Sequence, residues 1–116
     1  MYYFYVLQSL KNKDWFYKGS THDLKNRIEE HNNGENTSTI PYKPLRLVYY
    51  EAYLTKKSAI SREISVKKSG SVWMPLMKRI KKSLEDKYRT RKDAKIFRTV
   101  TGPPPQYLVP TKQHTM

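Results

Sequence analysis

The chain has 116 residues, enough for a single domain, and a formal net charge of +13. Such a charge favours polyanionic partners, either nucleic acid or an anionic membrane face, although a basic surface that serves only solubility would have the same composition. The absence of cysteine excludes disulfides and thiolate zinc sites.

No apolar run approaches the roughly 20 residues that a membrane span requires. The N-terminal segment MYYFYVLQSL lacks the basic region and the small-residue cleavage site of a signal peptide. We therefore expect a cytoplasmic protein with no membrane contact.

The charge is uneven, because residues 1–70 carry a net +5 and residues 71–116 a net +8.

The first predicted unit is a β-hairpin. Residues 2–9 are rich in aromatic and branched side chains, LKNKD supplies a turn, and residues 15–19 form the returning strand. A turn centred on Asn12 places Tyr5 opposite Gly19, with Tyr17 diagonal to Tyr5 on the same face. A glycine at that position is expected to leave room for a ligand to approach the Tyr5 hydroxyl, although tyrosines in strands are usually core residues.

A helix, a loop, a strand and two more helices follow. The helix spans residues 24–32 and ends at the sequence NNG, and residues 33–43 are expected to be an exposed loop. The later elements are a strand at 45–53, a helix at 56–68 capped by Thr55, and a helix at about 72–89. The order predicts an α+β fold with a small three-stranded sheet flanked by helices, a ββαβα core plus a C-terminal helix.

The sequence divides into a domain at residues 1–90 and a basic, proline-rich segment at residues 91–116. Three consecutive prolines and the lack of periodicity predict a flexible tail there, with a possible role in contacting a protein partner.

The helix at 24–32 directs two functional side chains inward. With Leu24 at zero on a helical wheel, Ile28 lies at about +40°, His31 at about −20° and Arg27 at about −60°. Both polar residues therefore share the inner half of the helix with its apolar residues, although a histidine buried only for structure remains an alternative.

The helix at 56–68 shows a similar pattern. With Ile60 at zero, Ile64 lies at about +40° and Glu63 at about −60°, at the edge of an apolar stripe. Carboxylates are seldom buried unless they are paired or bind a metal, so Glu63 is either a metal ligand or the partner of Arg27 in a structural salt bridge.

Two tyrosine hydroxyls, an arginine, a histidine and one inward carboxylate form a combination that suits phosphodiester hydrolysis. A carboxylate can hold one Mg²⁺, an arginine can neutralise charge on phosphoryl oxygens, and a phenolate or imidazole can accept a proton from water. The last role requires nearby cations to bring the pKa of that group toward neutrality.

The sequence resembles the GIY-YIG nuclease domain, which occurs in the N-terminal part of UvrC and in small stand-alone bacterial proteins. The matching segments are Tyr3-Phe4-Tyr5, Tyr17-Lys18-Gly19, DLKNRIEEHN with Arg27 and His31, KPLRLVYYEAY at 43–53, and Ala59, Glu63 and Lys67 in the pattern A-x-x-x-E-x-x-x-K. Tyr3 and Lys18 depart from the family's motif letters, and Ser20 stands where UvrC-like sequences carry a lysine.

The resemblance implies five catalytic residues. Tyr5 would be the general base with help from His31, Tyr17 would position phosphate or water, Arg27 would contact the phosphate, and Glu63 would hold a single Mg²⁺ or Mn²⁺ ion. Gly19 would be a structural residue of the second motif, and no small-molecule cofactor is expected.

We accordingly expect a metal-dependent endonuclease acting on double-stranded or branched DNA, possible settings being repair or recombination. The expected phosphate-backbone contacts are Lys67, Lys78, Arg79, Lys81 and Lys82, although the last four could equally form a solvated helix face. The alternatives are a nucleic-acid-binding protein that keeps this fold without catalysis and a basic protein associated with RNA.

Overall fold

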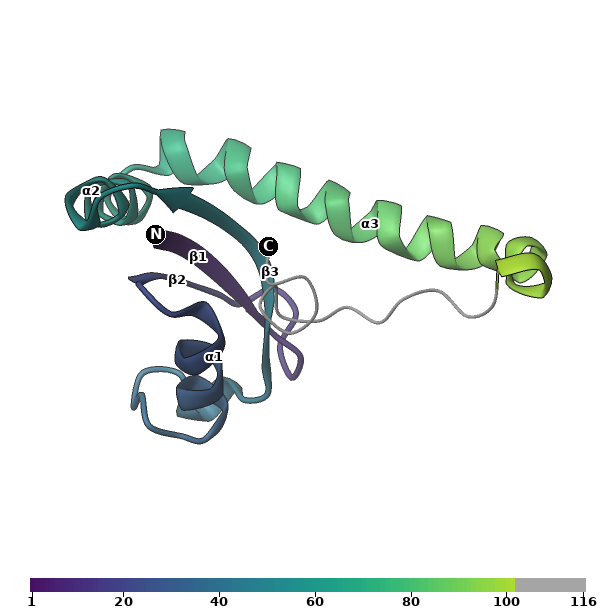
Figure 1. The fold of residues 1–116 in the computed structure, drawn as a ribbon, viewed down its shortest axis with the longest axis horizontal. Coiled ribbons are helices and arrows are strands. Elements are labelled where there is room, and N and C mark those ends of the chain that lie inside the picture. The colour runs from purple at the N-terminus through teal and green to yellow at the C-terminus, as the bar shows by residue number, and fades with distance from the viewer. Residues whose placement is uncertain (102–116) are drawn as a thin grey trace.

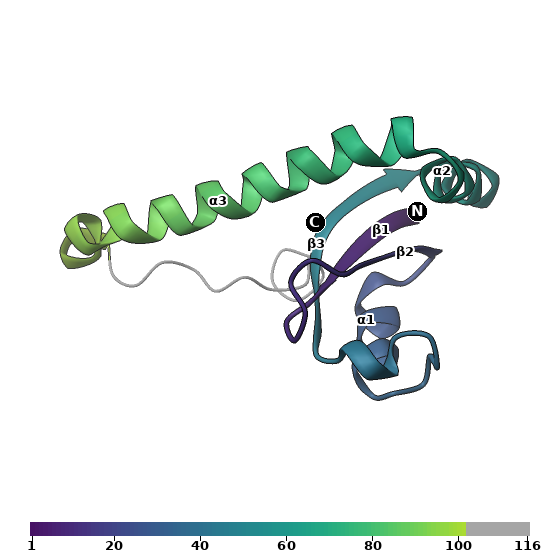
Figure 2. The same ribbon diagram turned by 180° about the vertical axis from the view of Figure 1, so that it is seen from behind.

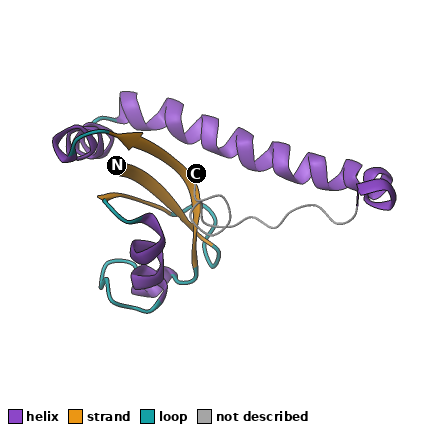
Figure 3. Ribbon diagram, in the orientation of Figure 1, coloured by secondary structure: helices purple, strands orange, loops and turns teal. Residues whose placement is uncertain are grey.

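A computed structural model describes the backbone of residues 1–101 and the side chains of residues 1–87. The fold is α+β, as the sequence predicts (Figures 1 and 3). Its elements, in chain order, are β1 (Tyr2–Ser9), β2 (Phe16–Thr21), α1 (Leu24–Asn32), the 3₁₀ turn η1 (Ile40–Tyr42), β3 (Leu45–Tyr53), α2 (Lys56–Lys68) and α3 (Gly70–Thr101).

The sheet has the strand order β2-β1-β3, with β1 antiparallel to both neighbours. Tyr5 pairs with Gly19 on β2, which confirms the predicted hairpin register, and with Tyr50 on β3. As the central strand, β1 has both faces covered, so its residues from Phe4 to Ser9 are all buried.

Helices cover both faces of the sheet (Figures 1 and 2). Because side chains alternate along a strand, Tyr5 and Leu7 lie on the face toward α1, whereas Phe4 and Val6 lie on the opposite face. The first cluster contains Tyr5, Leu7, Leu24, Ile28, Leu45 and Leu47, and the second contains Phe4, Val6, Val66, Leu76 and Ile80. The protein therefore has two small cores that share β1.

Helix α1 has the predicted bounds and the predicted inner face. The Asp23 side chain accepts a hydrogen bond from the backbone N–H of Asn26, which caps the first turn. Leu24, Ile28 and His31 are buried, as the helical wheel predicts.

Helix α2 has the predicted bounds but a different rotation about its axis. Its buried residues are Ala59 and Val66, whereas Ile60 and Ile64 lie on the surface. The predicted inner stripe was wrong because hydropathy favoured the two isoleucines, while the close approach of the helix to the sheet requires the small Ala59.

An ion pair supports this rotation together with the buried Ala59 and Val66. The Arg62 guanidinium donates from Nε and Nη2 to the Glu51 carboxylate at 3.0 and 3.1 Å, so it connects α2 to β3. The Tyr49 and Tyr53 hydroxyls donate to the same carboxylate, each at 2.5 Å. Burial raises the pKa of Glu51, but these hydrogen bonds outweigh it and lower the pKa overall.

Helix α3 extends beyond the expected residues 72–89 and continues to Thr101. No glycine or proline interrupts the sequence between Pro75 and Gly102, and three prolines follow Gly102, which accounts for the helix end. The division into residues 1–90 and a flexible tail at 91–116 stays a prediction, and residues 102–116 lie outside the described part of the chain. Among the described helices, none has the length and apolar character to span a bilayer.

We expect Ile80→Ala to lower the free energy of unfolding by about 2–5 kcal/mol, because it removes a fully buried side chain between α3 and the sheet. Met74→Ala, at an exposed position of the same helix, should change it by no more than about 0.5 kcal/mol. Urea denaturation of the two variants checks this, and equal losses would show that α3 does not contribute to the core.

Candidate active site

A chain of buried hydrogen bonds connects β1 to α1. The Tyr5 hydroxyl lies 3.0 Å from His31 Nε2, and His31 Nδ1 lies 2.9 Å from Thr39 Oγ1. All three side chains are almost completely buried. The Thr39 hydroxyl also donates to the Asn36 carbonyl oxygen at 3.1 Å.

These contacts assign the proton positions on His31. The single Thr39 proton is used on Asn36, so Thr39 Oγ1 accepts from His31 Nδ1–H. His31 Nε2 is then the unprotonated nitrogen, and it accepts a hydrogen bond from the Tyr5 hydroxyl. His31 is thus arranged to accept the Tyr5 proton.

Burial keeps both groups neutral. It lowers the pKa of His31 to about 4, and the nearby Arg27 contributes to this shift while Glu30 opposes it. Burial also raises the pKa of the Tyr5 hydroxyl, with further increases from Tyr17 and Glu63 and an opposing effect of Arg27. The expected shift of the tyrosine pKa toward neutrality is therefore absent, because desolvation outweighs the neighbouring cation.

Tyr17 and Gly19 complete this part of the site from β2. The Tyr17 ring lies 4.8 Å from the His31 ring and 6.3 Å from the Tyr5 ring, measured between centroids. A Cβ atom added at Gly19 would lie 2.6 Å from the Tyr5 hydroxyl oxygen. The expected open space above Gly19 is therefore occupied by the Tyr5 hydroxyl itself, which explains why this position requires glycine.

Glu63 approaches the same region from α2. Its carboxylate accepts hydrogen bonds from the Ser20 hydroxyl and from Lys67 Nζ, both at 2.6 Å. Lys67 Nζ also lies 5.8 Å from the centre of the Tyr17 ring. The alternative of a salt bridge between Glu63 and Arg27 was wrong, because Arg27 pairs with Glu30 at 3.6 Å.

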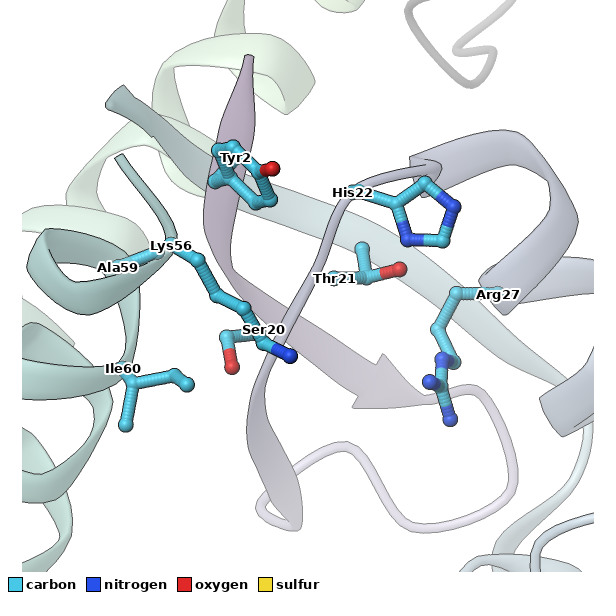
Figure 4. A pocket seen from close by; sticks show the side chains of 8 residues that line it. All are labelled: Tyr2, Ser20, Thr21, His22, Arg27, Lys56, Ala59 and Ile60. Atoms are coloured by element: carbon cyan, nitrogen blue, oxygen red, sulfur yellow. The ribbon is translucent and has the colours of Figure 1, made fainter. Parts of the chain in front are cut away.

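A pocket of about 430 Å³ opens beside this cluster, at the end of β2 (Figure 4). Arg27 lines it from α1, Ser20 from the end of β2, and Lys56 from α2. The complete lining is Tyr2, Ser20, Thr21, His22, Arg27, Lys56, Ala59 and Ile60, with no acidic residue among them. The charge and the hydroxyls of this pocket suit a phosphate group.

The residues present fit a magnesium ion that retains most of its water. Among the residues that the structure describes, Glu63 is the carboxylate that lies beside Tyr17 and Ser20, and its side chain is only 20% exposed. Among the described residues no group of three or more His, Asp or Glu side chains could enclose a metal. One carboxylate, waters and substrate phosphate form a ligand set typical of Mg²⁺, provided that Lys67 moves off the carboxylate.

The structure brings the five predicted catalytic residues together but separates them from the predicted α3 cations. Tyr5, Tyr17 and His31 are in contact. Glu63 lies beside them through Lys67, which pairs with Glu63 and lies near the Tyr17 ring, and Arg27 lines the adjacent pocket. Lys67 contacts Glu63, so it lies at the site. The predicted α3 cations lie on the helix over the opposite face of the sheet, and all four are exposed: Lys78, Arg79, Lys81 and Lys82.

Two residues of the site were not predicted. Ser20 is adjacent to the predicted Gly19, and its position after the second motif was the available signal. Thr39 lies in the loop before η1, where the sequence shows no periodicity and several hydroxyl residues in succession. Only the fold identifies which of those hydroxyls contacts His31.

Comparison with known proteins gives consistent matches. Residues 1–73 match the GIY-YIG catalytic domain. A UPF0213 protein of Lacticaseibacillus paracasei is 41% identical over 63 residues, which is 53% of this chain and 68% of that protein. A UPF0213 protein of Streptococcus pyogenes is 39% identical over 67 residues, or 57% of this chain and 71% of that protein. No solved structure matches.

We expect His31 to make stability depend on pH. Its folded pKa of about 4 lies below the ordinary 6.5, so the unfolded chain binds more protons between these values. The contribution of His31 to the free energy of unfolding should be fully present above about pH 6.5. It should decrease as the pH falls toward 4, by at most about 3 kcal/mol in total. Urea denaturation across this range should show a smaller decrease for His31→Gln than for the wild type.

The matched control for this measurement is His22→Asn, at an exposed position, which should retain the wild-type dependence. A His31→Gln protein that loses stability with the same slope as the wild type would contradict the assignment.

We expect Gly19→Ala to lower the free energy of unfolding by about 1–3 kcal/mol and to disrupt the Tyr5–His31 hydrogen bond, because the new methyl group overlaps the buried Tyr5 hydroxyl. Denaturation reports the first effect and the ¹⁵N shifts of the His31 ring report the second. Gly70→Ala is the control, since nothing lies within 4 Å of its Cβ. Unchanged His31 shifts in Gly19→Ala would be the contrary result.

Proposed function

This chain belongs to the GIY-YIG nuclease family, and on that premise we propose that it is a metal-dependent endonuclease that hydrolyses phosphodiester bonds in DNA. The observation that best supports the proposal is the convergence of Tyr5, Tyr17 and His31 from one face of the sheet with Glu63 from α2.

Tyr5 and His31 act together as the general base. A water that attacks phosphorus gives its proton to the Tyr5 oxygen while the Tyr5 proton passes to His31 Nε2, along the 3.0 Å hydrogen bond. Both groups are neutral before the reaction, because burial raises the pKa of Tyr5 and lowers the pKa of His31. Thr39 keeps the accepting nitrogen of His31 directed at Tyr5.

Arg27, Tyr17 and Glu63 have supporting roles. Arg27 binds a phosphoryl oxygen from the basic pocket, where its guanidinium can neutralise charge that develops in the transition state. Tyr17 positions the phosphate or the attacking water. Glu63 would hold one Mg²⁺ or Mn²⁺ ion, which would supply positive charge to neutralise the phosphate.

Long-range attraction to DNA comes from the net charge of +13. We propose that the exposed cations of α3 contact a second part of the phosphate backbone, because α3 lies over the face of the sheet opposite to the candidate site. These cations are Lys78, Arg79, Lys81 and Lys82. A cytoplasmic role in DNA repair or recombination, and contact of residues 91–116 with a protein partner, extend the same proposal.

A non-catalytic nucleic-acid-binding protein is the second candidate. The observation that favours it is the pairing of Glu63 with Lys67, which places a cation where a metal ion would bind. In that case the fold would supply a basic binding surface and no hydrolysis.

The test is incubation of the protein with supercoiled, branched and single-stranded DNA, each with Mg²⁺, Mn²⁺ or EDTA. We expect metal-dependent nicking that Glu63→Gln lowers by at least about 100-fold, since this variant removes the one carboxylate at the site. Parallel binding measurements by fluorescence anisotropy should show that Glu63→Gln still binds DNA, because the basic residues are unchanged.

The matched control is Glu29→Gln, an exposed glutamate on α1, which should nick DNA at the wild-type rate. DNA binding without nicking in either metal ion would support the non-catalytic alternative. Tighter binding to RNA than to DNA at physiological salt would instead favour the association with RNA.

A further inference from the structure

The outer face of α2 carries an apolar surface that the folded domain does not use. Ile60 and Ile64 are 36% and 45% exposed, and neither belongs to the two core clusters. Being four residues apart, they lie side by side on the helix, and we call them the isoleucine ridge. With Lys56, Lys57 and Ser61 they line an open hollow of about 600 Å³.

The isoleucine ridge is continuous with the basic pocket that opens beside the candidate active site. Ile60 and Lys56 line both this hollow and the basic pocket that holds Arg27 (Figure 4). Ser20, which lines that pocket, donates a hydrogen bond to the Glu63 carboxylate. A ligand strand that leaves the pocket on the side of α2 would therefore pass over the isoleucine ridge.

Charge indicates which ligand fits this surface. All the ionised side chains that line the two hollows are cations, namely Arg27, Lys56 and Lys57. A second copy of this chain would bring its own lysines against them, so self-association through this face is unfavourable. A ligand with an anionic edge and apolar faces is complementary, and a nucleic acid strand with accessible bases has both.

We propose that the isoleucine ridge packs against bases next to the scissile phosphate, with Lys56 and Lys57 on the flanking phosphates. In a fully stacked duplex this contact requires neighbouring bases to separate, which costs free energy. In a bulge, mismatch or junction the stack is already interrupted. The protein should therefore prefer DNA with interrupted stacking. This inference rests on the proposed function for the identity of its ligand.

The test compares two labelled DNA duplexes in EDTA, where no cleavage occurs. One is fully matched, and the other has the same sequence with a central unpaired bulge that contains 2-aminopurine. Wild-type full-length protein should bind the bulged duplex at least about tenfold more tightly and should increase 2-aminopurine fluorescence. The double variant Ile60→Ser/Ile64→Ser should reduce the ratio of the two affinities to about one.

Met74→Ser is the matched control, because Met74 is 46% exposed on α3 and outside both hollows. This variant should keep the wild-type ratio. Circular dichroism should show that the double variant folds, since both replaced side chains lie on the surface.

The inference is overturned if the wild type shows no preference for the bulged duplex or if the double variant keeps that preference. Two other results would also overturn it, if the ratio of the affinities for the two duplexes stays unchanged. One is that the double substitution abolishes a dimer seen in sedimentation, and the other is that it abolishes flotation of the protein with phosphatidylserine vesicles. A ridge-dependent preference without nicking in any metal would support this inference and contradict the proposed nuclease activity. Wild-type nicking of DNA without a preference for the bulged duplex would support the proposed nuclease activity and contradict this inference.

Discussion

The ion pair between Arg62 and Glu51 is the constraint on which the site depends. It supports the rotation of α2 against the sheet, with Tyr49 and Tyr53 adding hydrogen bonds to the same carboxylate. Successive helical residues differ by about 100° in direction, so a fixed Arg62 also fixes the direction of Glu63. The same rotation leaves Ile60 and Ile64 on the surface. One contact between α2 and β3 thus positions the carboxylate and exposes the isoleucine ridge.

The side chains of the candidate site carry no unpaired charge at Tyr5, His31, Glu63 or Lys67, although the protein is strongly basic. Tyr5 and His31 are both neutral through burial, and the charges of Glu63 and Lys67 are paired. A phosphate bound beside Glu63 would change this balance, because it would compete with the Glu63 carboxylate for Lys67. Neutral groups that are already hydrogen-bonded require little rearrangement when charge develops, which is the general advantage of preorganised sites.

Local features of the sequence were sufficient for the elements and for the hairpin. Asp23 and Thr55 mark helix starts by their capping oxygens, and the pairing of Tyr5 with Gly19 follows from turn position and strand alternation. The rotation of α2 could not be predicted in this way, because it depends on the pairing of Arg62 with a residue eleven positions earlier. The contact of His31 with Thr39 also depends on the course of an aperiodic loop.

Helix α3 gives the molecule an asymmetric charge. Residues 70–101 hold ten Lys and Arg against three Asp and Glu, a net +7 of the total +13. Much of the positive charge therefore lies in an arm that projects beyond the sheet (Figure 1). In the field of a polyanion, a charge displaced from the centre of mass produces a torque as well as an attraction. The arm would therefore approach a polyanion first, and the protein would reach it already oriented.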